Sequence, residues 1–549
     1  MSGEKMNTKD WWKNAVIYQV YPRSFQDTNG DGIGDIQGII YRLDYLQDLG
    51  INALWLSPVY ASPNKDNGYD VSDYFSIMEE FGTMDQMDSL IAEAKKRNIA
   101  IIMDLVTNHT SDEHRWFQEA RKSKGSPYRD YYIWRNPVDD GLPNDLMAGM
   151  SEPAWTFDEA TSQYYFHLFT KNQPDLNWEN PKVHQEIIDI IKFWAKKGVK
   201  GFRLDVIDLI GKVPDQMITV NGPHLHEYIH KISKGGFEKY HLMTIGETWS
   251  ADVSEALKYT RPERRELNML YTFSHVTLTE NIGPDKWSFT VKELDVPRLK
   301  VVIKEWQDGL NNDSWNALFW CNHDLPRIVS HYGDAQNDRV KSAKTLAILL
   351  HMQKGTPTIY QGEEIGMTNA LITDIKEARD IESLNMYELY AEQGVKKEEL
   401  LAKINYKGRD NARTPMQWDD TDNGGFTMGK PWLESNPNYD TINVEEALID
   451  SDSIYYTYKE LIRLRREEEW VTSADFQLIE TTDEKVIAYL RVSADKKVLV
   501  VCNLSSDERP FSYEGTIEKT ILSNLPVERL SLENSTLSAW ESQVLEVKL

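Results

Sequence analysis

The sequence is poor in cysteine and in long apolar runs, and each shortage excludes a class of protein. Among 549 residues only Cys321 and Cys502 are cysteines, so neither a disulfide framework nor a CxxC zinc or redox motif is possible. No apolar run approaches the ~20 residues that span a bilayer, and the polar first residues lack the apolar core of a signal peptide. We therefore expect a cytoplasmic protein with no membrane partner.

Positive charge is also scarce. The chain has 61 lysine and arginine residues against 87 aspartate and glutamate residues, which gives a net charge of −26. Such a surface repels nucleic acid and anionic lipid. A neutral or cationic partner fits better than a polyanion.

Short β-rich runs, by contrast, are abundant, and helix-like stretches lie between them. Eight such runs begin at Ala15, Ala53, Ala100, Gly201, Leu242, Leu267, Trp315 and Thr356. Residues 84–98 and 183–198 have apolar residues at helical spacing and end in Asn or Gly. Because parallel strands need helical crossovers, eight such units predict an α/β fold, a (β/α)8 TIM barrel.

Two parts of the chain depart from this alternation. Residues 111–180 are rich in Trp, Tyr, Pro and Asn with little periodicity, which predicts an inserted loop-rich domain after the third strand. From residue 473 the pattern changes to alternating strands, which predicts a C-terminal antiparallel β-sandwich over 473–549. The barrel would then occupy residues 1–110 and 181–472.

Polar residues gather where four of the predicted strands end. These ends read "DLVTNHTS", "GFRLDVID", "TIGETW" and "WCNHD". A lone acid at a strand end is more often a structural hydrogen-bond acceptor than a catalytic group. Barrel enzymes, however, build their sites at the carboxyl ends of the strands. We therefore expect Asp205, Glu247 and Asp324 to face one another across the barrel mouth.

Closely placed carboxylates indicate a particular chemistry. Like charges resist joint ionisation, so the pKa of one carboxyl group rises, whereas Arg203, two residues before Asp205, would keep that carboxylate ionised. Glycoside hydrolysis needs an ionised carboxylate beside a protonated one. A separation of about 5 Å would mean a retaining mechanism with a covalent intermediate.

The four strand ends, in this order, resemble the conserved regions of the α-amylase superfamily of glycoside hydrolases, and the resemblance covers nearly the whole chain. It implies that Asp205 is the nucleophile, that Glu247 is the general acid/base, and that Asp324 is a third carboxylate that distorts and holds the sugar. Three further residues of these ends are implied to surround the bound glucose and the nucleophile: His109, Arg203 and His323.

The string "QPDLNWEN", residues 173–180, resembles the signature of the oligo-1,6-glucosidase group. By resemblance, Asp66 and Arg409 bind the far hydroxyls of the terminal glucose, and Tyr69 stacks on its face. A carboxylate and a guanidinium at that end leave no room for another sugar, so the enzyme would trim from the non-reducing end. The same resemblance adds three residues to the pocket: Phe169, Gln173 and Arg413.

Linkage preference depends on fewer residues. Val206 follows the nucleophile, as in relatives that cut α-1,6 bonds, and a β-branched side chain there would narrow the leaving-group subsite. The string "GETW" resembles dextran glucosidases, and it implies that Trp249 stacks on the leaving sugar beside Lys286 and Glu382. We therefore predict an exo-acting retaining α-glucosidase that releases glucose from isomalto-oligosaccharides or dextran, and we expect it to be a monomer.

Several alternatives stay open. An oligo-1,6-glucosidase of short substrates would share these features, and trehalose-6-phosphate hydrolases share "WNALFWCNHD" but have "QADLN" where this chain has "QPDLN". The "RLDRD" string of sucrose isomerases is absent, while transglycosylation is open to any retaining enzyme. A catalytically inactive binding relative would lack carboxylates that this chain keeps.

The string "DTNGDGIGD" beginning at Asp27 looks like a calcium loop. It is not an EF-hand, because loop position 12 is Gly38 and the segment before it is strand-like, and a calcium sensor would also need paired sites. A metal-free turn is the alternative. Resemblance to the oligo-1,6-glucosidase group favours a structural Ca²⁺ instead. The expected ligands are the side chains of Asp27, Asn29, Asp31 and Asp35 and the carbonyl of Ile33.

Overall fold

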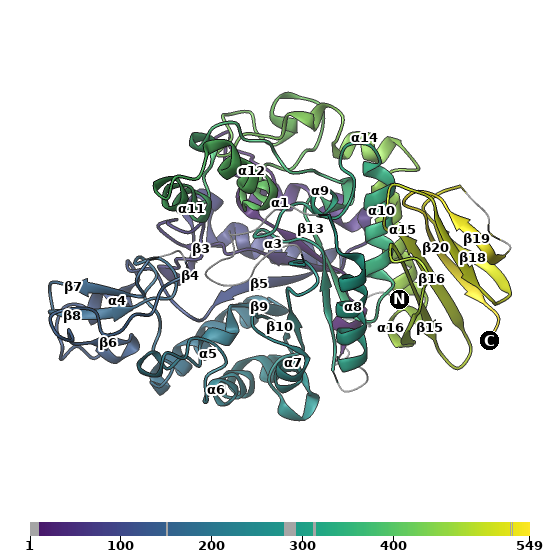
Figure 1. The fold of residues 1–549 in the computed structure, drawn as a ribbon. Coiled ribbons are helices and arrows are strands. Elements are labelled where there is room, and N and C mark those ends of the chain that lie inside the picture. The colour runs from purple at the N-terminus through teal and green to yellow at the C-terminus, as the bar shows by residue number, and fades with distance from the viewer. Residues whose placement is uncertain (1–9, 150–151, 279–292, 311–313, 527–528, 530) are drawn as a thin grey trace.

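Eight parallel strands form the centre of the molecule, for which a computed structural model describes residues 10–149, 152–278, 293–310, 314–526, 529 and 531–549 (Figure 1). Their order in the sheet is β11-β10-β9-β5-β2-β1-β13-β12, and every neighbouring pair is parallel. A parallel bridge between Leu270 and Asn316 joins the two ends, so the sheet closes into the predicted TIM barrel. The strands are β1 (Ile17–Val20), β2 (Ala53–Leu56), β5 (Ala100–Val106), β9 (Gly201–Asp205), β10 (Met243–Glu247), β11 (Met269–Tyr271), β12 (Ala317–Phe319) and β13 (Thr356–Tyr360).

The crossover helices surround this barrel, and α5 (Pro181–Lys197) shows how the sequence defines one. The Asn180 side chain accepts the Lys182 backbone N–H at its start, Pro181 occupies the first turn, and Gly198 ends it at φ +113°. Within the described residues, no helix is both long and apolar enough to cross a bilayer. The other helices of the barrel are α1 (Ile36–Tyr41), α2 (Leu43–Leu49), α3 (Met84–Lys96), α6 (Leu225–Ile232), α7 (Val253–Thr260), α8 (Val296–Leu310), α9 (Ile328–His331), α10 (Arg339–His351) and α15 (Ile454–Glu467).

The segment between β5 and α5 projects from the barrel as a separate lobe (Figure 1). It contains α4 (Arg115–Ala120) and a small antiparallel sheet in the order β6-β8-β7, formed by β6 (Trp134–Arg135), β8 (Gln163–Phe166) and β7 (Trp155–Asp158). A small cluster around Trp155 and Phe166 forms its core. An isolated bridge between His109 and Asp175 ties the end of the lobe back to the end of β5. A hairpin of β3 (Tyr60–Ala61) and β4 (Asp73–Ile77) precedes the lobe.

A long excursion, residues 361–453, separates β13 from α15. It lies over the barrel beside α1 and α9 (Figure 1). Its helices are α11 (Ile381–Glu392), α12 (Lys397–Lys407), α13 (Asp410–Arg413) and α14 (Val444–Ile449). This excursion brings Arg409 and Arg413 to the barrel mouth from a part of the chain far from the strands.

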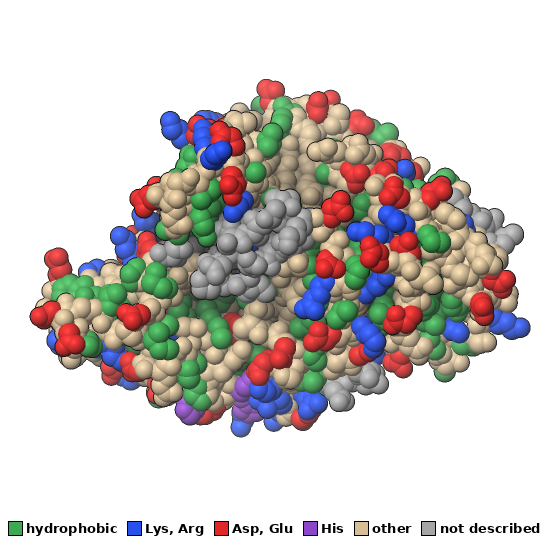
Figure 2. Space-filling view, in the orientation of Figure 1, with side chains coloured by type: hydrophobic (Ala, Val, Ile, Leu, Met, Phe, Trp, Pro, Cys, Tyr) green, Lys and Arg blue, Asp and Glu red, His purple; other side chains and the backbone are tan. Residues whose placement is uncertain are grey.

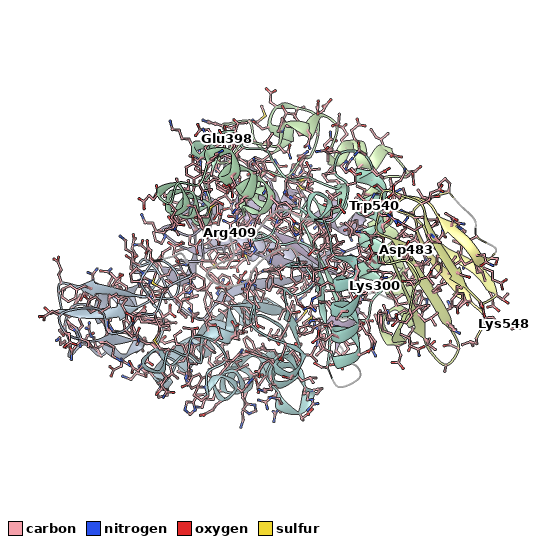
Figure 3. The ribbon with its side chains drawn as sticks, viewed as in Figure 1. Lys300, Glu398, Arg409, Asp483, Trp540 and Lys548 are labelled. Atoms are coloured by element: carbon pink, nitrogen blue, oxygen red, sulfur yellow. The ribbon has the colours of Figure 1, made fainter. Side chains whose placement is uncertain are left out.

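After α16 (Trp470–Ser473) the chain forms the predicted antiparallel domain. A five-stranded sheet has the order β14-β15-β16-β20-β18, and β17 pairs with β19 beside it. The domain packs on α8 and α10: the Tyr489 hydroxyl donates to the Leu349 carbonyl, and Lys300 Nζ reaches the Asp483 carbonyl (Figure 3). The strands are β14 (Asp475–Ile479), β15 (Val486–Val492), β16 (Lys497–Asn503), β17 (Arg509–Tyr513), β18 (Ile517–Ser523), β19 (Leu532–Leu537) and β20 (Ser542–Val547).

Candidate active site

The buried guanidinium of Arg203 on β9 lies at the centre of the site. Its Nη1 is 2.7 Å from Asp205 Oδ1 and 2.9 Å from Asp104 Oδ1, and its Nη2 is 2.5 Å from Glu247 Oε2. Alternate residues of a strand point the same way, so Arg203 and Asp205 share the face that points into the barrel. One cation therefore binds the carboxylates at the ends of two strands.

The backbone immediately after Asp205 is strained. Val206 has φ +35° and ψ +49°, a left-handed conformation that a β-branched residue rarely adopts. In this conformation its N–H donates to Glu247 Oε2 at 3.1 Å. The turn after the predicted nucleophile thus also orients the predicted acid/base.

Asp324, after β12, faces a different set of side-chain nitrogens. Arg413 Nη2 lies 2.7 Å and Arg409 Nη1 3.4 Å from Asp324 Oδ1, and His323 Nε2 lies 3.1 Å from Oδ2. Burial alone raises the pKa of Asp324, but His323, Arg413 and Arg409 outweigh burial and hold this pKa well below its usual range. Asp324 is therefore an ionised carboxylate at the mouth of the barrel.

The electrostatics of Asp205 differ from our expectation. Arg203 does lower the pKa of Asp205, as expected, but burial, Glu247 and Asp104 together raise it well above its usual range. Burial likewise raises the pKa of Asp104. One guanidinium is shared among three carboxylates, so the ion pair with Arg203 does not offset the burial of Asp205 and the charges of its two neighbours.

The far end of the pocket is formed by Asp66, Gln173 and Arg409. Gln173 Nε2 donates to Asp66 Oδ2 at 3.0 Å and lies 3.2 Å from His109 Nε2, while Arg409 Nη2 lies 3.6 Å from Asp66 Oδ1. The Phe169 ring packs against that of His109, with centroids 4.9 Å apart. The structure thus brings these predicted residues together, and Figure 3 shows Arg409 near the middle of the molecule.

An aromatic wall joins the two halves of the pocket. The Tyr69 and His323 rings stack with centroids 5.2 Å apart and planes 5° apart, and the Tyr69 hydroxyl lies 2.7 Å from His323 Nε2. The same hydroxyl donates to Asp104 Oδ2 at 3.0 Å. Tyr69 is therefore fixed by hydrogen bonds as well as by stacking.

Trp249 approaches the other carboxylate oxygen of Glu247, Oε1, and is partly exposed to solvent. Its side chain is 38% exposed, and its ring stacks on that of Phe273 with centroids 3.6 Å and planes 6° apart. Its indole N–H points at Glu247 Oε1 over 3.3 Å. Glu382 lies in the first turn of α11, near Arg409, whose pKa it helps to raise. Lys286 lies outside the described residues.

The predicted calcium loop is closed by its own hydrogen bonds. Asp27 accepts four, from the backbone of Asn29, Gly30 and Gly32 and from the Thr427 hydroxyl, while Asp35 accepts from Thr28 and from the first turn of α1. The atoms predicted to bind the metal are all oxygens, which suits Ca²⁺. Across the described residues, however, no group of three or more His, Cys, Asp or Glu side chains is arranged to hold a metal ion. Calcium stays a prediction.

The chain is similar to known proteins over nearly its whole length. A family model for the alpha-amylase catalytic domain matches residues 19–474. The chain belongs to the alpha-amylase family. Over 538 residues it is 52% identical to a glucan 1,6-alpha-glucosidase of Streptococcus pneumoniae, covering 98% of this chain and 99% of that protein. An oligo-1,6-glucosidase of Halalkalibacterium halodurans is 53% identical, with 98% of each chain covered.

A solved structure agrees with this assignment. The trehalose-6-phosphate hydrolase of Bacillus licheniformis superposes with a TM-score of 0.93 at 45% identity, covering 98% of this chain and 100% of that one. The predictions of an alpha-amylase family member, of a glycoside hydrolase and of the TIM barrel are confirmed.

Two residues of this alpha-amylase family site were not in the predicted set. Asp104 lies on β5, where it binds Arg203 and accepts from the Trp55 indole N–H. Asp380 caps α11 and accepts from Arg409 at 2.7 Å. Asp104 begins the string "DLVTNHTS", so its place at the end of a predicted strand was visible in the sequence. Only His109 of that string was predicted to be a site residue.

Proposed function

We propose that this chain is an exo-acting, retaining α-glucosidase that hydrolyses α-1,6 bonds at the non-reducing ends of isomalto-oligosaccharides and dextran and releases glucose. The observation that carries the proposal is the single Arg203 guanidinium bound by both Asp205 and Glu247. The relatives named glucan 1,6-alpha-glucosidase and oligo-1,6-glucosidase support the linkage.

The chemistry follows from the placement of the two carboxylates. The Asp205 carboxylate attacks the anomeric carbon, the bond from that carbon to the glycosidic oxygen breaks, and Glu247 gives its proton to this oxygen as the remaining sugar leaves. Glu247 then takes a proton from the water that hydrolyses the glucosyl ester on Asp205. One guanidinium fork spans the two groups, which matches the separation of about 5 Å in retaining enzymes better than the wider gap of inverting ones. The positive charge of Arg203 also stabilises the Asp205 carboxylate that is released when the glucosyl ester is hydrolysed.

The end of the pocket supports exo action. Asp66, Gln173 and Arg409 are joined by short polar contacts, and Asp380 holds Arg409 from behind. A terminal glucose can exchange its hydroxyls for these contacts, but the chain of a longer sugar has no passage through them. Glucose would therefore be removed one unit at a time.

The leaving-group side supports the α-1,6 preference. Val206 lies at the turn beside Glu247, and Trp249 offers a partly exposed ring on which a flexible 1,6-linked sugar can stack.

The proposal has four further parts. We propose a structural Ca²⁺ in the loop at residues 27–35, a cytoplasmic location, a monomeric state, and an oligosaccharide as the partner.

The stereochemical test is proton NMR of the first product formed from isomaltotriose. Retention requires that α-glucose appears first; initial β-glucose would contradict it. The Asp205→Asn variant should abolish hydrolysis of a chromogenic α-glucoside, and Asp215→Asn, an exposed carboxylate paired with Arg135, is the matched control.

Linkage and chain length need a panel of isomaltose, panose, dextran, maltose and trehalose-6-phosphate. We expect the highest kcat/KM on 1,6-linked substrates. Faster cleavage of maltose than of isomaltose would contradict the linkage assignment. Preference for trehalose-6-phosphate would replace the proposed function with a phosphosugar hydrolase.

A further inference from the structure

Gln19 on β1 is a buried polar residue that was not in the predicted site. All four residues of this strand are buried, and Gln19 has no exposed surface. Its side-chain Nε2 lies 2.9 Å from Nδ1 of His323 and donates to the Ser57 hydroxyl at 3.1 Å. An amide inside the barrel therefore reaches one of the residues implied to surround the bound glucose.

The imidazole ring of His323 is held in one orientation. Tyr69 stacks on it with centroids 5.2 Å apart, Tyr21 stacks on it at 6.0 Å, and Trp55 meets it edge-on at 6.2 Å. Arg413 Nε donates to the backbone carbonyl of His323 at 2.9 Å. Because the residue is only 1% exposed and closely packed, each ring nitrogen keeps its own neighbours.

The neighbours of Nε2 favour a proton on that nitrogen. The Tyr69 hydroxyl lies 2.7 Å from Nε2 and donates its only proton to Asp104 Oδ2 at 3.0 Å. The Tyr69 oxygen is therefore left to accept from His323. Asp324 Oδ2, a second acceptor, lies 3.1 Å from the same nitrogen.

The neighbour of Nδ1 favours the opposite state. The Nε2 of a glutamine amide has two N–H groups and accepts no hydrogen bond, so its contact with Nδ1 needs an unprotonated ring nitrogen. The two acceptors of the Gln19 amide are then His323 and Ser57. The alternative is a doubly protonated imidazolium, which would need the amide turned end for end so that its oxygen faces Nδ1.

The charges around the ring count against that alternative. Asp324 already pairs with Arg413 at 2.7 Å and with Arg409 at 3.4 Å. Asp104, which accepts the proton of the tyrosine, pairs with Arg203 at 2.9 Å. A buried imidazolium would have to share a carboxylate that has a guanidinium partner, and it would add the cost of desolvating a further charge.

We propose that Gln19 is a positioning residue for His323: its amide N–H occupies Nδ1 and so keeps the single ring proton on Nε2, where it can be donated to a hydroxyl of the bound glucose. Gln19 has no exposed surface, so it acts through the histidine. This inference rests on the proposed function, because it presumes that His323 faces the sugar.

The first test is nitrogen NMR of the full sugar-free chain with isotopically labelled histidine. The signals of His323 are identified by their loss in His323→Asn. We expect an unprotonated Nδ1 and a protonated Nε2 in the wild type, because the two ring nitrogens of a neutral histidine are distinct. A protonated Nδ1, in the other neutral form or in an imidazolium, overturns the proposal without the need for any variant of Gln19.

Two substitutions then test whether Gln19 is the cause. Gln19→Glu keeps the size of the side chain but presents only acceptor oxygens, so the His323 signals should become those of an imidazolium. Gln19→Leu removes the donor without adding a charge, so Nε2 carries the proton less often. Because one hydrogen bond to the sugar is then weakened, kcat/KM on isomaltose should fall about tenfold.

Gln307→Leu is the matched control for the loss of a buried amide. Gln307 lies on α8 and bonds to the Gln353 side chain and to the backbone of Lys354. This variant should lower the thermal midpoint but leave the His323 signals and kcat/KM as in the wild type. Unchanged His323 signals in Gln19→Leu overturn the positioning role, whatever its activity. Should that variant not fold, Gln19→Glu decides, since a ring that stays neutral there overturns the role.

The two proposals fail in distinguishable ways. A wild-type enzyme that does not hydrolyse isomaltose contradicts the proposed function, while the position of the His323 proton can still be measured. A wild-type enzyme that is active on isomaltose but has a protonated Nδ1 contradicts only the role of Gln19.

Discussion

At the residue scale, Asp380 shows how the cations of the pocket are kept in position. It is fully buried, caps α11 through the Ser383 N–H, and accepts from Arg409. Burial raises the pKa of Asp380, but Arg409 and Arg413 outweigh burial and lower it to about 2. Arg409, which we propose to bind the sugar, is thus held in place by a buried carboxylate.

Asp380→Asn should therefore raise KM for isomaltose about tenfold, with a smaller change in kcat, since one strong charge-assisted contact is lost. Asp374→Asn, an exposed cap in the same excursion, should leave KM unchanged.

The depressed pKa of Asp380 also implies that its ionised form stabilises the fold. This stability is present above the unfolded pKa of ~3.9 and is lost as pH falls towards 2. Acid unfolding of Asp380→Asn should be less steep in that window; an unchanged KM would refute the role.

Val206 combines a strained backbone with a position beside Glu247, on the proposed leaving-group side. A β-branched residue at φ +35° costs on the order of 1–3 kcal/mol, and Val206→Ala relieves part of this while widening the subsite. We expect unchanged or higher thermal stability and a several-fold rise in the kcat/KM ratio of maltose to isomaltose. Val213→Ala, in the same loop but at a negative φ of −131°, is the control and should not alter this ratio.

The predicted catalytic residues could be picked out from the sequence because Asp205 and Glu247 end mostly apolar strands and Asp324 follows one. Asp380 could not be found in this way. It precedes a helix inside a 93-residue excursion, and its partner Arg409 is 29 residues away. The direction of the pKa shift of Asp205 could not be predicted either. It depends on how many carboxylates share one guanidinium, and the sequence does not show that Asp104 is the third.

At the scale of elements, the 27–35 loop and the excursion form one unit. The Asp27 N–H donates to the Phe426 carbonyl, the Trp432 N–H donates to the Gly32 carbonyl, and a Cβ on Gly32 would lie 1.8 Å from the Lys430 carbonyl oxygen. The loop therefore braces the segment that follows Arg413. Glycine is required at position 32 both for this contact and for its φ of +89°.

If calcium binds here, chelation should lower the thermal midpoint by several degrees. Asp31→Asn is the informative variant, because within the described part of the chain Asp31 accepts only from the Ile33 N–H, and an asparagine oxygen can do the same. This variant should keep the midpoint of the chelated wild type and lose the response to calcium. Elemental analysis that finds no metal, together with an absent shift, would leave the loop a metal-free turn.

The loops after β10 and β11 depend on each other through Trp249 and Phe273. Phe273→Leu removes the stacked face, so kcat/KM for isomaltotriose should fall several-fold, whereas α-glucosyl fluoride, whose leaving group has no ring to stack, should be affected little. Phe157→Leu, an exposed ring of the lobe, is the control. Equal losses on both substrates would indicate a general structural defect instead.

Elements were predictable in proportion to their apolar content. The eight barrel strands and β15, β16 and β20 are mostly buried, and their sequences show it. The lobe's sheet was not predicted, because its strands have two to four residues and too few alternations to show a period. Strands such as β18, which has no fully buried residue, also gave no signal.

At the scale of the whole molecule, acidic side chains are distributed over the visible face among basic ones rather than gathered in one patch (Figure 2). The net negative charge is therefore spread over this face and does not form a single acidic site. The C-terminal domain is joined to the barrel more specifically, because Arg491 is buried and donates to the Met352, Trp470 and Ala474 carbonyls. The barrel and this domain therefore share buried polar contacts as well as apolar ones.

The closure of the barrel has a consequence for its response to heat. Other neighbouring strands pair over three to five residues, whereas in the described chain β11 and β12 share the single bridge between Leu270 and Asn316. Hydrogen exchange should therefore be fastest along this seam, and equal protection of β5 and β11 amides would disprove the idea. Phe273 lies at the seam, against Phe319. On warming, the enzyme would then lose discrimination between leaving sugars first. Its selectivity for glucose would persist, because the glucose pocket lies on the side of the barrel where the strands pair over more residues.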